Sequence, residues 1–145
     1  MNEKAGLRVR VRDVMTAPPR VIDGLASIQE AVELMREAHV SSLVIDRRHE
    51  DDEYGMVSVH DVAEQVIGRD RSLERVSVYE IMSKPVLTVD ADMDVKYAIR
   101  ILTRFKLNRG LVTENGEMVG IVTLRDMTIR YPGQNPSVPK KALSN

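Results

Sequence analysis

The chain has 145 residues, of which 43% are hydrophobic and 30% charged, a composition typical of a globular protein that buries a core. Its 21 Lys and Arg residues nearly balance 22 Asp and Glu residues, so no strong positive field favours nucleic acid as a partner. The absence of cysteine excludes disulfides, a thiolate nucleophile and Cys-based zinc sites. No apolar run has the length of a membrane span, and the first residues lack a signal-peptide core, so we expect a cytoplasmic protein.

The N-terminal extension, residues 1–10, alternates apolar and basic residues from position 7 onward. This predicts a frayed end or a short edge strand, with a basic lip over an anionic ligand as the alternative. A first repeat begins at residue 11. It opens with Asp-Val-Met-Thr at residues 13–16, and the matching Glu-Ile-Met-Ser lies 67 positions later at residues 80–83, each followed by one residue and a proline. Since proline disfavours helix in the residue before it, a short helical turn should end by Thr16 and by Ser83.

An extended segment, a helix and a strand follow in both copies at the same 67-residue offset. Ser27 and Glu30 have the spacing of a capping box and predict the start of the first helix, whereas Asp92 or Asp94 would cap the second. The expected extended segments are residues 20–23 and 86–90, and the expected strands are residues 40–46 and 107–113.

The next turn differs between the two copies. In the first copy residues 47–53 form a long charged loop, which we expect to be solvated. In the second copy Asn115 and Gly116 give the Asn-Gly signal of a tight hairpin.

A seven-residue motif closes each copy and is the most informative feature of the sequence. It reads Gly-Met-Val-Ser-Val-His-Asp at residues 55–61 and Gly-Ile-Val-Thr-Leu-Arg-Asp at residues 120–126. A strand that begins with glycine is followed by a hydroxyl residue, which can cap a helix, and by an acid in the first helical turn. The expected helices cover about residues 60–67 and 124–131, with a polar linker at residues 68–77 and a flexible tail rich in Pro and Gly at residues 132–145.

The sequence therefore predicts two β-α-β-β-α repeats, residues 11–67 and 78–131, in an α/β (α+β) fold. One unit of this size is marginal alone, but two could share a core through their sheets. We expect pseudo-twofold symmetry that brings the two strand-to-helix junctions towards one cleft.

These motifs resemble the CBS (cystathionine β-synthase) domains, which occur as tandem pairs, over roughly residues 11–130. The resemblance implies a stand-alone regulatory module rather than an enzyme, forming homodimers and binding AMP, ADP, ATP, NAD or S-adenosylmethionine between the repeats. It also implies a regulated protein partner, which the sequence does not name.

The resemblance further implies a role for individual residues. Asp61 and Asp126 would bind ribose hydroxyls. The expected contacts to ribose or phosphate are Ser58, Thr123, His60, Arg125, Ser41, Ser42, Asn108 and Arg109, and the expected adenine contacts are Thr16, Val21, Ile22, Ser83, Leu87 and Thr88. Because the second repeat has two arginines where the first has His60, we expect unequal sites, the Asp126 site preferring phosphorylated ligands.

Other interpretations stay open at this point. Asp61 and Asp126 could simply stabilise helix starts. The module could instead serve dimerisation or protein docking, with degenerate ligand sites, or could bind single-stranded nucleic acid. The histidines lack metal-ligand spacing, and no catalytic motif is present, so we expect neither a metal site nor catalytic residues. The apolar residues that would serve a docking surface on the closing helices are Val62, Val66, Met127 and Ile129.

Overall fold

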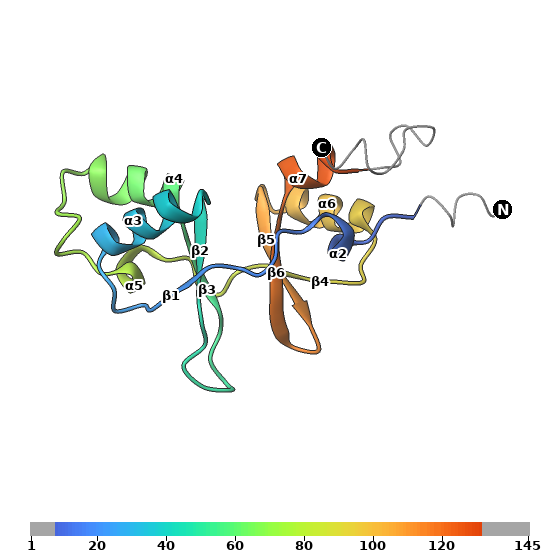
Figure 1. The fold of residues 1–145 in the computed structure, drawn as a ribbon, viewed down its shortest axis with the longest axis horizontal. Helices are drawn as coiled ribbons and strands as arrows, with labels where there is room; N and C mark the ends of the chain where they lie inside the picture. Colours follow the sequence, from blue (N-terminus) through green and yellow to red (C-terminus); the bar gives the residue numbers. More distant parts are fainter. Residues whose placement is uncertain (1–7, 132–145) are drawn as a thin grey trace. The chain divides into compact units, whose positions relative to one another are not determined.

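The structure, a computed structural model, describes residues 8–131, which separate into two compact units (Figure 1). Unit 1 combines residues 8–18 with residues 87–131, and unit 2 consists of residues 19–86. The opening segment of the first repeat therefore lies with the body of the second repeat. In the same way, residues 78–86 of the second repeat lie with the body of the first.

Both units contain a three-stranded sheet, and these are the sheets found in residues 8–131. In each, a short first strand pairs parallel with the second, which forms an antiparallel hairpin with the third. This mixed architecture confirms the α/β prediction. The elements of unit 2 are β1 (Val21–Ile22), α3 (Ile28–Ala38), β2 (Ser42–Ile45), β3 (Gly55–Ser58), α4 (Val59–Val62), the π-helical turn η1 (Ala63–Ile67) and α5 (Val78–Ile81). Those of unit 1 are α2 (Val11–Val14), β4 (Thr88–Asp90), α6 (Val95–Arg104), β5 (Arg109–Glu114), β6 (Glu117–Thr123) and α7 (Leu124–Ile129).

The local signals in the sequence explain where several elements begin and turn. At α3 the Glu30 N–H donates to Ser27 Oγ at 3.1 Å, and the Ser27 N–H donates to the Glu30 carboxylate at 3.0 Å, which confirms the capping box. Of the two acids proposed to cap α6, Asp94 is the one that accepts a backbone N–H, from Lys96 at 2.8 Å. The turn between β5 and β6 has positive φ at Asn115 (53°) and Gly116 (82°), as its Asn-Gly sequence predicts.

Each unit has its own aliphatic core, in which helices cover one sheet. Val62, Val66 and Met127 belong to these cores and are 3%, 0% and 0% exposed, whereas Ile129 is 59% exposed. The prediction of a docking surface on the closing helices was therefore wrong for three of its four residues. Their side chains face the core because the apolar face of a short helix packs on its sheet.

The opening segment of each repeat, residues 11–18 or residues 78–86, pairs with the last strand of the other repeat. We call each of them a crossing segment. Thr16 exchanges two backbone hydrogen bonds with Ile121 of β6, at 2.8 and 2.9 Å. Ser83 makes the matching pair with Met56 of β3, at 2.8 and 3.0 Å. These bonds fix the hydroxyl residue of each opening segment beside the seven-residue motif of the other repeat.

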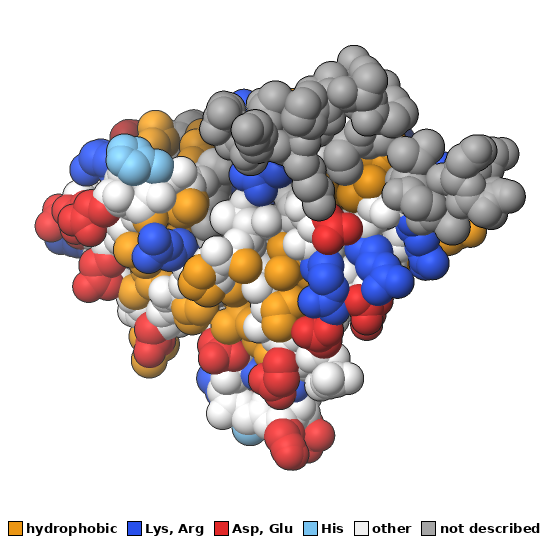
Figure 2. Space-filling view, turned by 45° about the vertical axis from the view of Figure 1, so that its right-hand side comes forward, with side chains coloured by type: hydrophobic (Ala, Val, Ile, Leu, Met, Phe, Trp, Pro, Cys, Tyr) orange, Lys and Arg blue, Asp and Glu red, His pale blue; other side chains and the backbone are white. Residues whose placement is uncertain are grey.

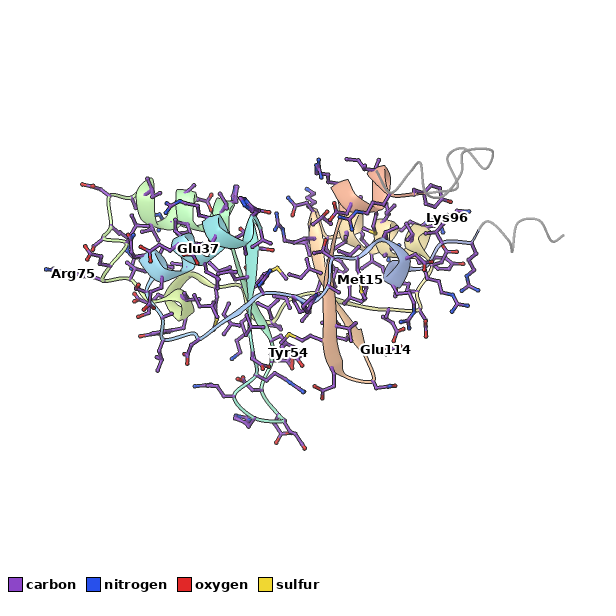
Figure 3. All side chains as sticks on the ribbon, viewed as in Figure 1. Met15, Glu37, Tyr54, Arg75, Lys96 and Glu114 are labelled. Atoms are coloured by element: carbon purple, nitrogen blue, oxygen red, sulfur yellow. The ribbon has the colours of Figure 1, made fainter. Side chains whose placement is uncertain are left out.

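Glycine is required where the crossing segment meets β6. A Cβ built on Gly120 would lie 2.8 Å from the Thr16 carbonyl oxygen and 2.7 Å from the sulfur of Met15, which extends toward this strand (Figure 3). At Gly55 the corresponding close contact is with the flexible Met82 sulfur, at 2.9 Å, and the Ser83 carbonyl oxygen is 3.4 Å away. The close approach of backbone therefore explains the glycine at position 120, whereas at Gly55 the close neighbour is a side chain.

The charged loop of the first repeat is mostly exposed, as predicted, with Asp52 as its exception. The side chain of Asp52 is 9% exposed and lies 2.7 Å from Lys84 Nζ, in the crossing segment of unit 2. In the N-terminal extension, Arg8 pairs with Asp94 and Arg10 pairs with Asp92, both acids of unit 1. The predicted tail, residues 132–145, lies outside the described residues, as do residues 1–7. Within the described chain, no helix is long and apolar enough to cross a membrane.

Candidate functional site

The junction between β6 and α7 in unit 1 gathers several of the predicted site residues. Thr123 caps α7 by accepting the Asp126 N–H at 2.9 Å. The carbonyl of Asn108 accepts the Leu124 N–H at 2.8 Å, and Arg109 is the register partner of Thr123. The start of β5 is therefore held against the start of α7, and the predicted residues from both elements lie at one place.

The carboxylate of Asp126 is the centre of this junction. Its side chain is 17% exposed, with Oδ2 lying 3.5 Å from the Thr16 hydroxyl, and Oδ1 lying 3.6 Å from Arg125 Nη1. Arg125 is 78% exposed, and Arg109 donates from Nε to the Asn108 side chain at 3.3 Å. A carboxylate beside a hydroxyl and the Arg125 guanidinium can accept hydrogen bonds from a diol while the arginine attracts an anionic group.

Two further predicted residues of unit 1 lie at the neighbouring strand β4, Thr88 at its start and Leu87 just before it. The Leu87 carbonyl accepts the Leu111 N–H at 3.0 Å, and Thr88 is the register partner of Leu111. Since Leu111 is two residues from Arg109, this pairing places Leu87 and Thr88 one strand away from the junction.

The corresponding junction of unit 2 uses its acid differently. Asp61 Oδ2 accepts both the backbone N–H of Ser58, at 2.9 Å, and the Ser58 hydroxyl, at 3.0 Å, in a capping box at α4. His60 is exposed, Ser42 is 5% exposed opposite Ser58, and the Ser41 carbonyl accepts the Val59 N–H. In the described part of unit 1, Asp126 makes no matching bond to Thr123.

The predicted adenine contacts divide between the units. Thr16 approaches Asp126 of the second repeat. Ser83 pairs with Met56 of the first repeat, two residues before Ser58. Val21 and Ile22 form β1 and line a cavity of about 700 Å³ in unit 2, together with Tyr79 and Met82 from the crossing segment. The repeat pattern assigned Thr16 to the first repeat. It did not indicate that the opening segment of each repeat packs in the unit formed by the other repeat.

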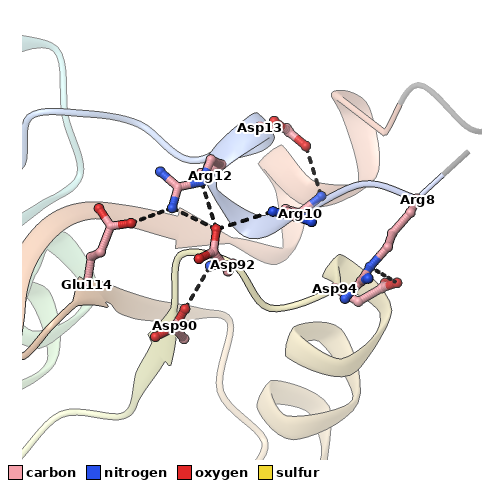
Figure 4. A network of polar contacts seen from close by, with 8 residues as sticks. All are labelled: Arg8, Arg10, Arg12, Asp13, Asp90, Asp92, Asp94 and Glu114. Atoms are coloured by element: carbon pink, nitrogen blue, oxygen red, sulfur yellow. Dashed lines mark hydrogen bonds and ion pairs between the residues drawn. The ribbon is translucent and has the colours of Figure 1, made fainter. Parts of the chain in front are cut away.

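Sequence reasoning also missed two ion clusters. In unit 1 the Arg12 guanidinium contacts both Asp92, at 2.7 Å, and Glu114 (Figure 4). Hydrogen bonding to Arg12 lowers the pKa of Asp92, and the two acids raise the pKa of Arg12. In unit 2 the Lys84 ammonium holds the pKa of the Asp52 carboxyl well below its usual range. No local motif predicts such pairs, because their members lie far apart along the chain.

A metal ion or a polyanion would need a particular grouping of the charged side chains in residues 8–131. No group of three or more His, Asp or Glu side chains there could hold a metal ion. On the face drawn in Figure 2, a short row of basic side chains is bordered by acidic side chains. Such intermixing fits the near-zero net charge of the sequence.

A family model of the CBS domain matches residues 11–68 and again residues 78–132. The chain belongs to the CBS domain family. It is a tandem CBS pair, and the two matched regions correspond to the two sequence repeats.

Known proteins similar to this CBS pair agree on the fold. An uncharacterized protein of Methanopyrus kandleri is 32% identical over 120 residues, covering 80% of this chain and 57% of that protein. The hexameric CBS-CP12 protein from bloom-forming cyanobacteria has a TM-score of 0.84 and 28% identity, covering 90% of this chain and 77% of that one. A CBS domain protein from Pyrobaculum aerophilum, solved in complex with AMP, shares the fold with a TM-score of 0.72 and 19% identity, over 82% and 90% of the two chains. The CBS pair spans about half the length of the curated relatives that it matches, between 41% and 57% for the first three.

Proposed function

We propose that the protein is a regulatory CBS pair that binds an adenosine-containing ligand at the β6–α7 junction of unit 1. The observation that carries this proposal is the Asp126 carboxylate, which faces the Thr16 hydroxyl at 3.5 Å beside the Arg125 guanidinium. A ribose diol would donate to the carboxylate, and a phosphate would pair with Arg125 and Arg109. The AMP complex of the Pyrobaculum aerophilum protein supports the choice of ligand class.

The regulatory role follows from the same proposal. The ligand would change the affinity of the CBS pair for a regulated protein, to the extent that it binds the two conformations with different affinity. Catalysis is not part of the proposal, in which the junction residues would recognise a nucleotide.

Thermal unfolding with AMP, ADP, ATP, NAD and S-adenosylmethionine tests the ligand class. A ligand at 100 times its dissociation constant adds about 2.7 kcal/mol to the free energy of unfolding, which raises the midpoint by several degrees. We expect this rise for at least one of the five ligands and its loss in Asp126→Ala.

The matched control is Asp94→Asn, an acid at the start of α6 in the same unit, which keeps a side-chain oxygen for the Lys96 N–H. This variant should retain the full shift. If none of the ligands shifts the wild type, or if both variants lose the shift equally, the proposal fails.

Association of copies is a second part of the proposal. Exposed apolar side chains of unit 1, Phe105 (61%) and Ile129 (59%), follow α6 and end α7, two helices that pack on each other. The hexameric CBS-CP12 protein shows that a similar chain assembles. We expect a homodimer by light scattering and a monomer for Phe105→Asp/Ile129→Asp, and a wild-type monomer at high concentration would contradict this part.

A further inference from the structure

The cavity of unit 2 lies away from the strand-to-helix junction of that unit. It opens beside Ile45 at the hairpin end of the sheet, where Ile45 is the register partner of Gly55. Ser58, at the junction, is three residues further along β3, roughly 10 Å at the rise of a strand. The cavity is thus a separate feature from the Ser58 and Asp61 pair.

The equivalent place exists in unit 1, because the two units share the same backbone there. The Tyr79 N–H donates to the Gly24 carbonyl at 2.9 Å, and the Arg12 N–H, 67 positions earlier, donates to the Ala91 carbonyl at 2.9 Å. The turn below is also shared. The Leu25 N–H donates to Asp23, and the Asp92 N–H donates to Asp90, both at 2.8 Å.

The side chains at these shared positions differ in kind. In unit 1, Arg12, Asp92 and Glu114 form a closed ion cluster over the place (Figure 4). The three residues 67 positions away in unit 2 are Tyr79, Leu25 and Arg47, which cannot form that cluster. Tyr79 is 52% exposed and Leu25 is 79% exposed, and both line the cavity. The same backbone therefore carries an ion cluster at this place in unit 1 and apolar side chains beside a cavity in unit 2.

At one end of the cavity two cationic side chains, Lys84 and Arg48, contact a single carboxylate, Asp52. Lys84 Nζ lies 2.7 Å from Asp52 Oδ1, and Arg48 Nε lies 3.3 Å from Asp52 Oδ2. Two cations therefore share one carboxylate, whose low pKa keeps it charged. The other acids of the wall accept backbone N–H groups of their own turns, Asp23 from Leu25 and Asp46 from Arg47.

We propose that this cavity binds a small molecule with an apolar or aromatic body and one anionic group. The body packs against Ile45, Met82, Tyr79 and Leu25, and the anionic group lies at the Lys84 and Arg48 end. Its volume, about 700 Å³, is within the range of roughly 300–1,000 Å³ that ligand pockets occupy. Val21 and Ile22, predicted as adenine contacts, also line this cavity, so competition with AMP decides whether the cavity is separate from nucleotide binding.

The test uses the whole chain and the fluorescent probe 8-anilinonaphthalene-1-sulfonate, an aromatic anion. We expect saturable binding by one probe molecule per chain. The variant Leu25→Asp/Arg47→Glu/Tyr79→Arg introduces the ion cluster of unit 1 and should weaken binding at least about tenfold. Lys84→Gln, which removes a charged partner of the anionic group, should weaken it by about tenfold as well.

Controls separate the cavity from other apolar surface and from the nucleotide site. Tyr97→Asp changes an exposed apolar residue of unit 1, 57% exposed, and should leave probe affinity unchanged. Tyr79→Arg alone changes an exposed side chain and serves as a second closing variant if the triple variant fails to fold. Unchanged affinity in the closing variants, no saturable binding, equal binding of the uncharged 1-anilinonaphthalene, or displacement of the probe by AMP would each overturn the proposal.

Discussion

Unit 1 and unit 2 repeat one backbone plan but use their acids in different ways. In unit 2 the Asp61 carboxylate is occupied by the N–H and hydroxyl of Ser58, so it holds the start of α4. In unit 1 the Asp126 carboxylate faces Thr16 of the crossing segment instead. Away from the junctions the units differ again. Unit 1 has the Arg12, Asp92 and Glu114 ion cluster at the place where unit 2 has a cavity. A duplicated motif therefore supports two distinct local chemistries through a few side-chain differences.

The largest expected effect is a loss of stability when alanine replaces the glycine that contacts each crossing segment. It tests whether the two crossing segments are packed equally tightly against their strands. Gly120→Ala places a Cβ against the Thr16 carbonyl, a backbone atom, and should lower the free energy of unfolding by about 3 kcal/mol. Gly55→Ala meets chiefly the flexible Met82 side chain and should cost about 1 kcal/mol. Urea denaturation of both variants measures the difference. A loss at Gly55 as large as that at Gly120 would contradict the comparison.

The sequence predicts most of the secondary structure but not the contacts of the crossing segments. Periodicity, capping boxes and the Asn-Gly turn predicted most helices and strands, because these signals act within a few residues. The local pattern of residues 13–16 carries no information about which sheet the segment joins. The pairing of Thr16 with Ile121 depends on packing that forms only in the folded chain.

The same limit explains the residues of the candidate site. The hydroxyl and the acid of the second motif were singled out because they repeat, whereas Arg109 and Arg125 were proposed from the family resemblance. The approach of Thr16 to Asp126 and the capping role of Asp61 depend on side-chain orientation, which residue spacing does not specify. The buried Asp52 was missed because its partner Lys84 lies in the other repeat.

A smaller effect is expected from removing each acid in turn. Asp61→Ala removes the capping contacts of Ser58 and should lower the free energy of unfolding by about 1 kcal/mol. Asp126→Ala loses mainly a favourable charge at a helix start, about 0.5 kcal/mol or less. Thermal or urea unfolding without ligand compares the two. A greater loss for Asp126→Ala would mean that its carboxylate is also structural.

The smallest effect concerns the acid dependence of unit 2. Because Lys84 lowers the pKa of Asp52, the stability from this pair is present above the unfolded-state pKa of about 3.9 and is lost as pH falls below it. Lys84→Met should therefore reduce the loss of stability between about pH 5 and about pH 2. Lys96→Met, an exposed lysine at the start of α6, should leave the wild-type pH dependence unchanged. Equal slopes in all three proteins would contradict the role of Lys84.

Calorimetric titration of AMP into the wild type, Asp126→Ala and Asp61→Ala tests the inequality of the two junctions most directly. AMP carries both the ribose diol and the phosphate that the Asp126 junction would recognise. We predict that Asp126→Ala weakens AMP binding at least about tenfold and that Asp61→Ala changes it by less than about threefold. A larger loss in Asp61→Ala than in Asp126→Ala would contradict the account, and if AMP does not bind the wild type, the same comparison is made with whichever of the five ligands raises the unfolding midpoint.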